Sequence, residues 1–158
     1  MQMKVIYILR VIFVSFEALL LTVAYLLWVQ FLDEINIFTA SLDVSQEIIK
    51  YLMFLPAAIA TWVINECRLL LQDDKETVRI LTLWDDYWRL KVHVWVSIFY
   101  ALSFTLFSIL PWVVKSGIGT GGGMLLFITS IVGQFILAIS IYDARLSVKE
   151  FVVHVKTA

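Results

Sequence analysis

Long apolar stretches dominate the chain and alternate with short charged segments. Apart from one glutamate, the charged residues fall at the ends of these stretches or between them, and the stretches cover about residues 5–32, 48–65, 92–114 and 120–142. An α-helix rises about 1.5 Å per residue, so about 20 apolar residues cross a hydrocarbon core of about 30 Å. The pattern therefore predicts an all-α polytopic membrane protein, a four-transmembrane-helix bundle formed by residues 1–158 as a single domain.

The second stretch is the shortest of the four. Its uncharged part covers residues 51–65 and contains Pro56, and Ile48 and Ile49 extend it toward the preceding connection. A re-entrant hairpin is the alternative to a full crossing at this length. The charge distribution requires an even number of crossings, which favours a full span.

Basic residues predict the orientation. Ten of the twelve lysines and arginines lie in the N-terminal segment, in the connection at 66–91 and in the tail at 143–158, whereas the other two connections contain only Lys50 and Lys115. Short cytoplasmic segments of membrane proteins are enriched in Lys and Arg. We therefore expect both termini to be cytoplasmic, in a membrane such as the bacterial inner (plasma) membrane.

Composition supports the membrane interpretation and excludes other classes. Hydrophobic residues make up 61% of the chain, against about 45–50% in soluble domains. The net charge is −1 and there is a single cysteine, Cys67, so neither a nucleic-acid partner nor an intrachain disulfide is expected. The lipid bilayer is the predicted environment.

Glu17 is the glutamate that interrupts the first apolar stretch. A charged side chain near the middle of a bilayer costs about 2.5–3.5 kcal/mol on insertion scales, so such residues usually face a protein interior or water. Counting about 1.5 Å per residue places Glu17 and three other polar side chains at similar depths. We therefore predict an intramembrane polar layer of Glu17, Gln134, Ser97 and Thr61.

Two roles are open for this layer. In the structural one, Glu17 donates or accepts hydrogen bonds with Gln134 and Ser97 and specifies which helices pair. In the functional one, Glu17 takes part in proton- or cation-coupled transport, or lines an oligomeric pore. The four spans and the sequence Phe16-Glu17-Ala18-Leu19 resemble the small multidrug transporters, but the acidic connection at 33–50, the 26-residue connection at 66–91 and the chain length depart from that family.

The connection at 66–91 has the pattern of an amphipathic helix or helical hairpin. Apolar residues recur at steps of three and four, and the candidates for partner contact are Val78, Leu81, Trp84 and Trp88. This face packs against the bundle, against another copy of the chain, or against a different protein. The tail at 143–158 has a similar pattern and predicts a short interfacial C-terminal helix.

Side chains typical of enzymes are present but poorly arranged. Neighbouring residues on a helix point about 100° apart, so neither Asp73-Asp74 nor Asp85-Asp86 can direct both carboxylates at one ion. His93 has no second histidine at matching depth for haem, and no serine has a visible base. We therefore expect no enzyme activity and no catalytic, cofactor or metal site.

These features together predict a function based on contact with other proteins. We expect a small non-enzymatic integral membrane protein that acts as an accessory, regulatory or immunity-like subunit through helix–helix contacts. Its partner would be another membrane protein or further copies of itself. The alternative is a homo-oligomeric pore or a proton- or cation-coupled transporter that uses Glu17.

Overall fold

The computed structural model describes residues 2–42, 51–52, 54–72, 75–82, 84–114 and 117–157. Within these ranges the chain is helical apart from short turns, and it contains no strand. The helices are α1 (Gln2–Phe13), α2 (Phe16–Ser41), α4 (Phe54–Gln72), α5 (Lys75–Thr82), α6 (Tyr87–Val113), the short 3₁₀ helix η1 (Gly117–Gly119) and α7 (Gly121–Thr157). Of these, α2, α4, α6 and α7 are long and apolar enough to cross a membrane, which confirms the prediction of a helical protein with four helices able to span a bilayer.

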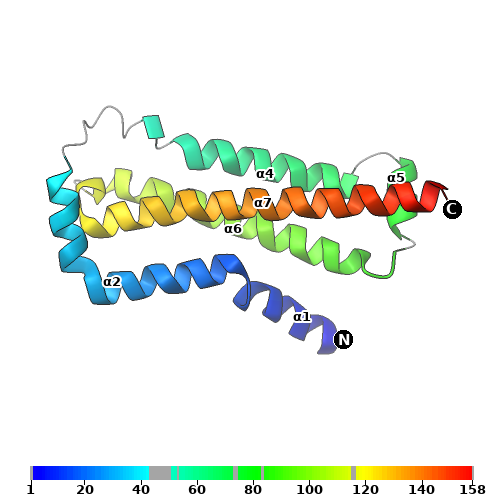
Figure 1. Cartoon of the computed structure of the whole chain (residues 1–158), viewed down its shortest axis with the longest axis horizontal. Helices are drawn as coiled ribbons and strands as arrows, with labels where there is room; N and C mark the ends of the chain where they lie inside the picture. The colour runs from blue at the N-terminus through cyan, green and yellow to red at the C-terminus, as the bar shows by residue number, and fades with distance from the viewer. Residues whose placement is uncertain are drawn as a thin grey trace.

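Three helices form the core. Figure 1 shows α4, α6 and α7 side by side along the long axis, and each of them packs against the other two. Most fully buried apolar side chains come from these helices, and Leu81 of α5 joins them; those of α4, α6 and α7 include Val63, Val94, Ala101, Phe104, Leu137 and Ile141. The fourth long helix, α2, packs along α7, and Glu17 and Thr39 are its buried residues. The packing is thus a three-helix core with α2 along one side, chiefly against α7.

The first predicted span differs most from the structure. A break at Val14 and Ser15 divides the predicted helix at 5–32 into α1 and α2. At the other end, α2 continues to Ser41, so residues 33–41 are helical rather than part of a loop. The helix bends at Phe31, whose φ of −125° and ψ of 19° are not helical, and the distal part of α2 turns across the start of α7 (Figure 1).

The other boundaries are closer to the predictions. The connection at 66–91 is helical over most of its described length, because α4 extends to Gln72, α5 follows and α6 begins at Tyr87. The tail does not form a separate helix, since α7 runs without interruption to Thr157. Asp73, Asp74 and the predicted start of the second span at 48–50 lie outside the described residues. The N- and C-termini lie at the same end of the molecule (Figure 1).

A glycine allows α6 and α7 to pack closely at mid-length. A Cβ on Gly133 of α7 would lie 2.5 Å from Cζ of Phe104, whose ring is fully buried in the core. One residue further on, the Gln134 Nε2 group donates a hydrogen bond of 2.8 Å to the Ala101 carbonyl of α6 and lies 3.2 Å from Thr105 Oγ1. Close van der Waals contact and interhelical hydrogen bonds hold helices together in apolar surroundings.

Gly133→Ala should destabilise the core because the new methyl group must displace the Phe104 ring. Overpacking of this kind costs about 1–3 kcal/mol, so we expect a lower melting temperature in detergent, measured by circular dichroism. Gly119→Ala is the matched control, since nothing lies within 4 Å of a Cβ at that position. Equal melting temperatures for the two variants would contradict the close packing described above.

Candidate functional site

The break between α1 and α2 is fixed by hydrogen bonds. The Val14 amide donates to the Arg10 carbonyl and completes α1, and the Ser15 hydroxyl caps α2 by accepting a hydrogen bond of 3.2 Å from the Ala18 amide. The carbonyl of Ile12, left without a helical partner by the break, accepts a hydrogen bond of 2.6 Å from the Tyr100 hydroxyl of α6. A side chain of α6 therefore fastens the break to the core.

Glu17 lies directly after this break. It is the second residue of α2 rather than the middle of a continuous span, and its side chain is only 7% exposed. The positive end of the helix dipole favours a carboxylate in the first turn. Among the described residues Glu17 forms no hydrogen bond or ion pair.

His93 contacts a polar side chain of a neighbouring helix. Its Nε2 atom lies 3.1 Å from the Ser140 hydroxyl of α7, and the tautomer decides which group donates. His93 and Ser140 therefore form a polar contact between α6 and α7.

The predicted polar layer is only partly present. Gln134 is fully buried and Ser97 nearly so, but the hydrogen bonds of Gln134 go to α6, at a level about 9 Å along α7 from Ser140. Thr61 is exposed and its hydroxyl donates to the Ala57 carbonyl of its own helix. Glu17 therefore has neither Gln134 nor Thr61 as a hydrogen-bond partner. His93 and Ser140 were absent from the predicted layer.

The residues predicted to contact a partner pack against other helices of the same chain. Leu81 is buried in the core, and the Trp84 ring stacks on Phe151 of α7 at a centroid distance of 4.9 Å. Trp88 meets Tyr7 of α1 edge to face, also at 4.9 Å, and Val78 is partly buried. The apolar side is thus covered mainly by α1 and α7 of the same chain, which corresponds to packing against the bundle, the first of the three alternatives for this face.

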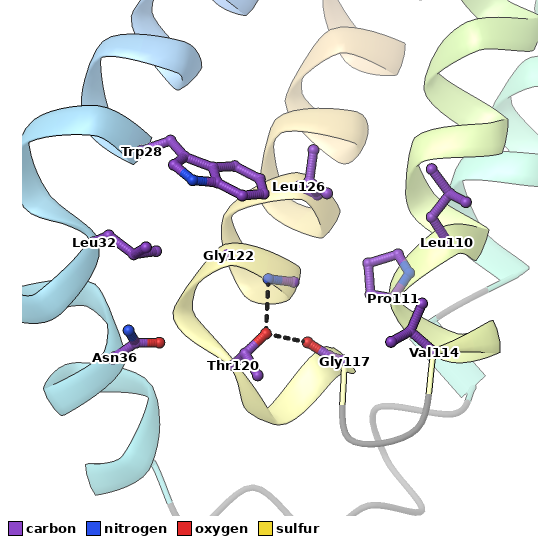
Figure 2. A pocket seen from close by; sticks show the side chains of 11 residues that line it. Trp28, Leu32, Asn36, Leu110, Pro111, Val114, Gly117, Thr120, Gly122 and Leu126 are labelled. Carbon is purple, nitrogen blue, oxygen red and sulfur yellow. Dashed lines mark hydrogen bonds between the residues drawn. The ribbon is translucent and has the colours of Figure 1, made fainter.

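A second site is an open apolar pocket at the end of the molecule opposite the termini. It has a volume of about 470 Å³, within the range of about 300–1,000 Å³ common for ligand sites. Figure 2 shows Trp28 and Leu32 of α2 on one side, Pro111 and Val114 of α6 on the other, and the start of α7 between them. The remaining lining residues are Asn36, Leu110, Gly117, Thr120, Gly122, Gly123 and Leu126.

Hydrogen bonds fix the polar end of this pocket. The Asn36 side-chain oxygen accepts a hydrogen bond of 2.7 Å from the Gly121 amide, which ties α2 to the first residue of α7. Thr120 donates to the Gly117 carbonyl and accepts from the Gly123 amide (Figure 2). Asn36 Oδ1 and the Thr120 hydroxyl are therefore already paired, and the lining is mainly apolar.

Comparisons with known proteins give no further guide to these sites. No family model matches the chain, and neither a curated protein nor a solved structure shows significant similarity to it. The functional argument therefore rests on the geometry of the two sites and on the packing of α2.

Tyr100→Phe should loosen the break between α1 and α2, because the Ile12 carbonyl loses its interhelical donor. A hydrogen bond of this kind contributes about 0.5–1.5 kcal/mol, so amide hydrogen exchange over residues 13–19 should become roughly two- to tenfold faster. Tyr142→Phe, at an exposed position of α7, is the control and should leave exchange unchanged. Identical exchange in wild type and Tyr100→Phe would show that the hydroxyl does not hold the break.

Proposed function

We propose that the chain is an integral membrane protein with both termini on the cytoplasmic side, in a bacterial inner membrane. The excess of Lys and Arg in the N-terminal segment, the connection at 66–91 and the tail supports this orientation. The N- and C-termini lie at the same end of the molecule (Figure 1), as an even number of crossings would require.

Within that membrane, the protein is a non-enzymatic accessory, regulatory or immunity-like subunit that acts through helix–helix contacts. The observation that carries this proposal is the packing of α2. In its most apolar 18-residue window no residue is buried, whereas 33% are buried in α4 and 39% in α6 and in α7. A long helix that packs mainly on one neighbour leaves most of its circumference available to a partner.

Exposure alone does not select a protein partner over lipid, because apolar side chains gain little from leaving hydrocarbon. The pocket beside α2 favours a protein partner, because a concave surface can receive specific side chains whereas contact with lipid needs no such shape. Trp28 and Leu32 belong both to α2 and to the pocket wall, so a partner helix lying along α2 can insert apolar side chains there. Van der Waals fit of this kind is a main source of helix association in membranes.

Site-specific cross-linking tests this interface. A photoreactive amino acid at Tyr25 or Val29, both more than half exposed on α2, should give a discrete adduct in the native membrane. The partner mass in that adduct identifies either a second copy or another membrane protein. The same probe at Leu102 or Leu106, exposed to a similar degree on α6, is the matched control. Equal adduct yields from the two helices, or lipid adducts alone, would overturn the proposal.

A second candidate function is a homo-oligomeric pore or a proton- or cation-coupled transporter. The observation that favours it is the burial of Glu17 in the first turn of a membrane-spanning helix. If this function is correct, Glu17→Gln should abolish flux in reconstituted vesicles, measured with an entrapped pH-sensitive dye, while circular dichroism shows an unchanged fold. Glu34→Gln, at an exposed position of the same helix, should retain flux. Wild-type flux in Glu17→Gln would remove Glu17 from any transport mechanism.

A further inference from the structure

The break between α1 and α2 carries an apolar notch, which we call the elbow notch. It has a volume of about 290 Å³ and is lined by Phe13, Val14, Ser15, Phe16, Leu19 and Thr22. Phe16, Leu19 and Thr22 follow one another at steps of three and therefore form one face of the first two turns of α2. The elbow notch thus runs from the end of α1 along the start of α2.

The elbow notch opens away from the core of the protein. Phe13, Val14 and Phe16 are 73%, 76% and 75% exposed, whereas the neighbouring Glu17 is buried. The polar groups at the notch are already paired, since Ser15 caps α2 and the Thr22 hydroxyl donates to the Ala18 carbonyl. The surface that remains for a ligand is therefore mainly apolar.

The depth of the elbow notch in a bilayer follows from the charges on α2. Residues 18–32, between Glu17 and Asp33, carry no charged side chain and rise about 22 Å in a helix, against a hydrocarbon core of about 30 Å. The helix bends at Phe31, just before Asp33. The hydrocarbon therefore extends slightly beyond Glu17 at the other end, and the break, where α1 leaves α2 at an angle (Figure 1), lies at its edge.

A cation lies one turn before the elbow notch. Arg10 precedes Phe13 and Val14 by three and four residues and so shares their face of α1. Helical side chains tilt toward the N-terminus of their helix, which directs the Arg10 guanidinium away from the hydrocarbon and toward the lipid headgroups. Arg10 is exposed and takes part in no ion pair among the described residues.

We propose that the elbow notch binds an anionic phospholipid, with one acyl chain along Phe16 and Leu19 and the headgroup phosphate at Arg10. The first sixteen residues of the chain contain Lys4 and Arg10 and no acidic residue. Basic side chains at a membrane surface attract anionic lipids, and an arginine can bind a phosphate through two parallel hydrogen bonds. The charge of the site thus complements that of the lipid.

Concave shape and charge together distinguish this site from the other exposed apolar surfaces. The pocket beside Trp28 is larger, but its lining contains no charged residue. The exposed side chains Tyr25 and Val29, at which we expect partner contact, lie one or more turns beyond the elbow notch on α2. Lipid binding at the break is therefore compatible with any partner of α2, and it does not depend on which side of the membrane the termini occupy.

Photoreactive lipids in nanodiscs test the proposal with the full chain. Phosphatidylglycerol and phosphatidylcholine probes with the same diazirine-bearing acyl chain are each added to phosphatidylcholine nanodiscs, and adducts are mapped by mass spectrometry. One basic residue near the surface contributes about 1 kcal/mol, so adducts within residues 13–22 should be roughly fivefold more abundant with phosphatidylglycerol. Both leaflets have the same composition, so the result is independent of orientation.

Variants of Arg10 assign the headgroup contact. Arg10→Gln should reduce the phosphatidylglycerol adducts to the phosphatidylcholine level, whereas Arg10→Lys should retain most of the preference. Lys149→Gln removes an exposed charge from α7 and should leave the preference unchanged. Equal labelling by the two probes in wild type would overturn the proposal, as would a preference that survives in Arg10→Gln or is lost equally in Lys149→Gln.

A substitution that fills the elbow notch tests the acyl-chain contact. Leu19→Trp places a larger side chain in the lining and should lower the adducts at residues 13–22 with the phosphatidylglycerol probe. Leu26→Trp, at an exposed position of α2 outside the notch, is the matched control and should leave them unchanged. Undiminished adducts in a Leu19→Trp variant whose circular dichroism matches wild type would show that the acyl chain lies elsewhere.

Discussion

Most polar groups inside the apolar helices find a partner within the chain, and much of the structure follows from this constraint, although the described residues include exceptions such as Gln134 Oε1 and Thr39 Oγ1. An unpaired backbone or hydroxyl group in hydrocarbon costs several kcal/mol. Hydroxyl groups of the long helices accordingly donate back to carbonyls three or four residues earlier, as Thr22, Thr105 and Ser130 do. Where the helical pattern is broken, at Val14 and Ser15, another helix supplies the missing donor through Tyr100. The Ser15 hydroxyl, at 3.4 Å, is a second and longer donor to the same Ile12 carbonyl.

The same constraint separates what the sequence could predict from what it could not. Hydropathy depends on composition within each segment, so the class of fold and the approximate positions of the long helices were readable. The burial of Gln134 was also readable, because a polar amide in an apolar helix has to face protein. The break before Glu17 was missed because neither proline nor glycine marks it. The available signal was Ser15 as an N-cap with an acidic residue two positions later.

The contacts between helices could not be predicted from one sequence, and the reason is geometric. Depth along a helix can be counted from its end, but the direction of a side chain around the axis depends on how the helices rotate against one another. Thr61 has a depth similar to its predicted partners and yet is exposed on α4. His93 and Ser140 are 47 residues apart and meet only because of the register between α6 and α7. Likewise, the amphipathic pattern around Trp84 predicted that another segment covers its apolar face, but it could not identify that segment as the part of α7 that contains Phe151.

These contacts leave α2 as the helix that is held at a few points rather than along its length. One attachment lies just before its start, where the Tyr100 hydroxyl donates to the Ile12 carbonyl of α1, and another is at Asn36, which accepts from the Gly121 amide. Between them α2 contacts α7 without any buried residue in its most apolar window. A helix attached in this way can change its neighbours at low cost, because few buried side chains must be repacked. The polar contacts at its ends therefore determine where α2 lies, while its exposed apolar side chains determine what it can bind.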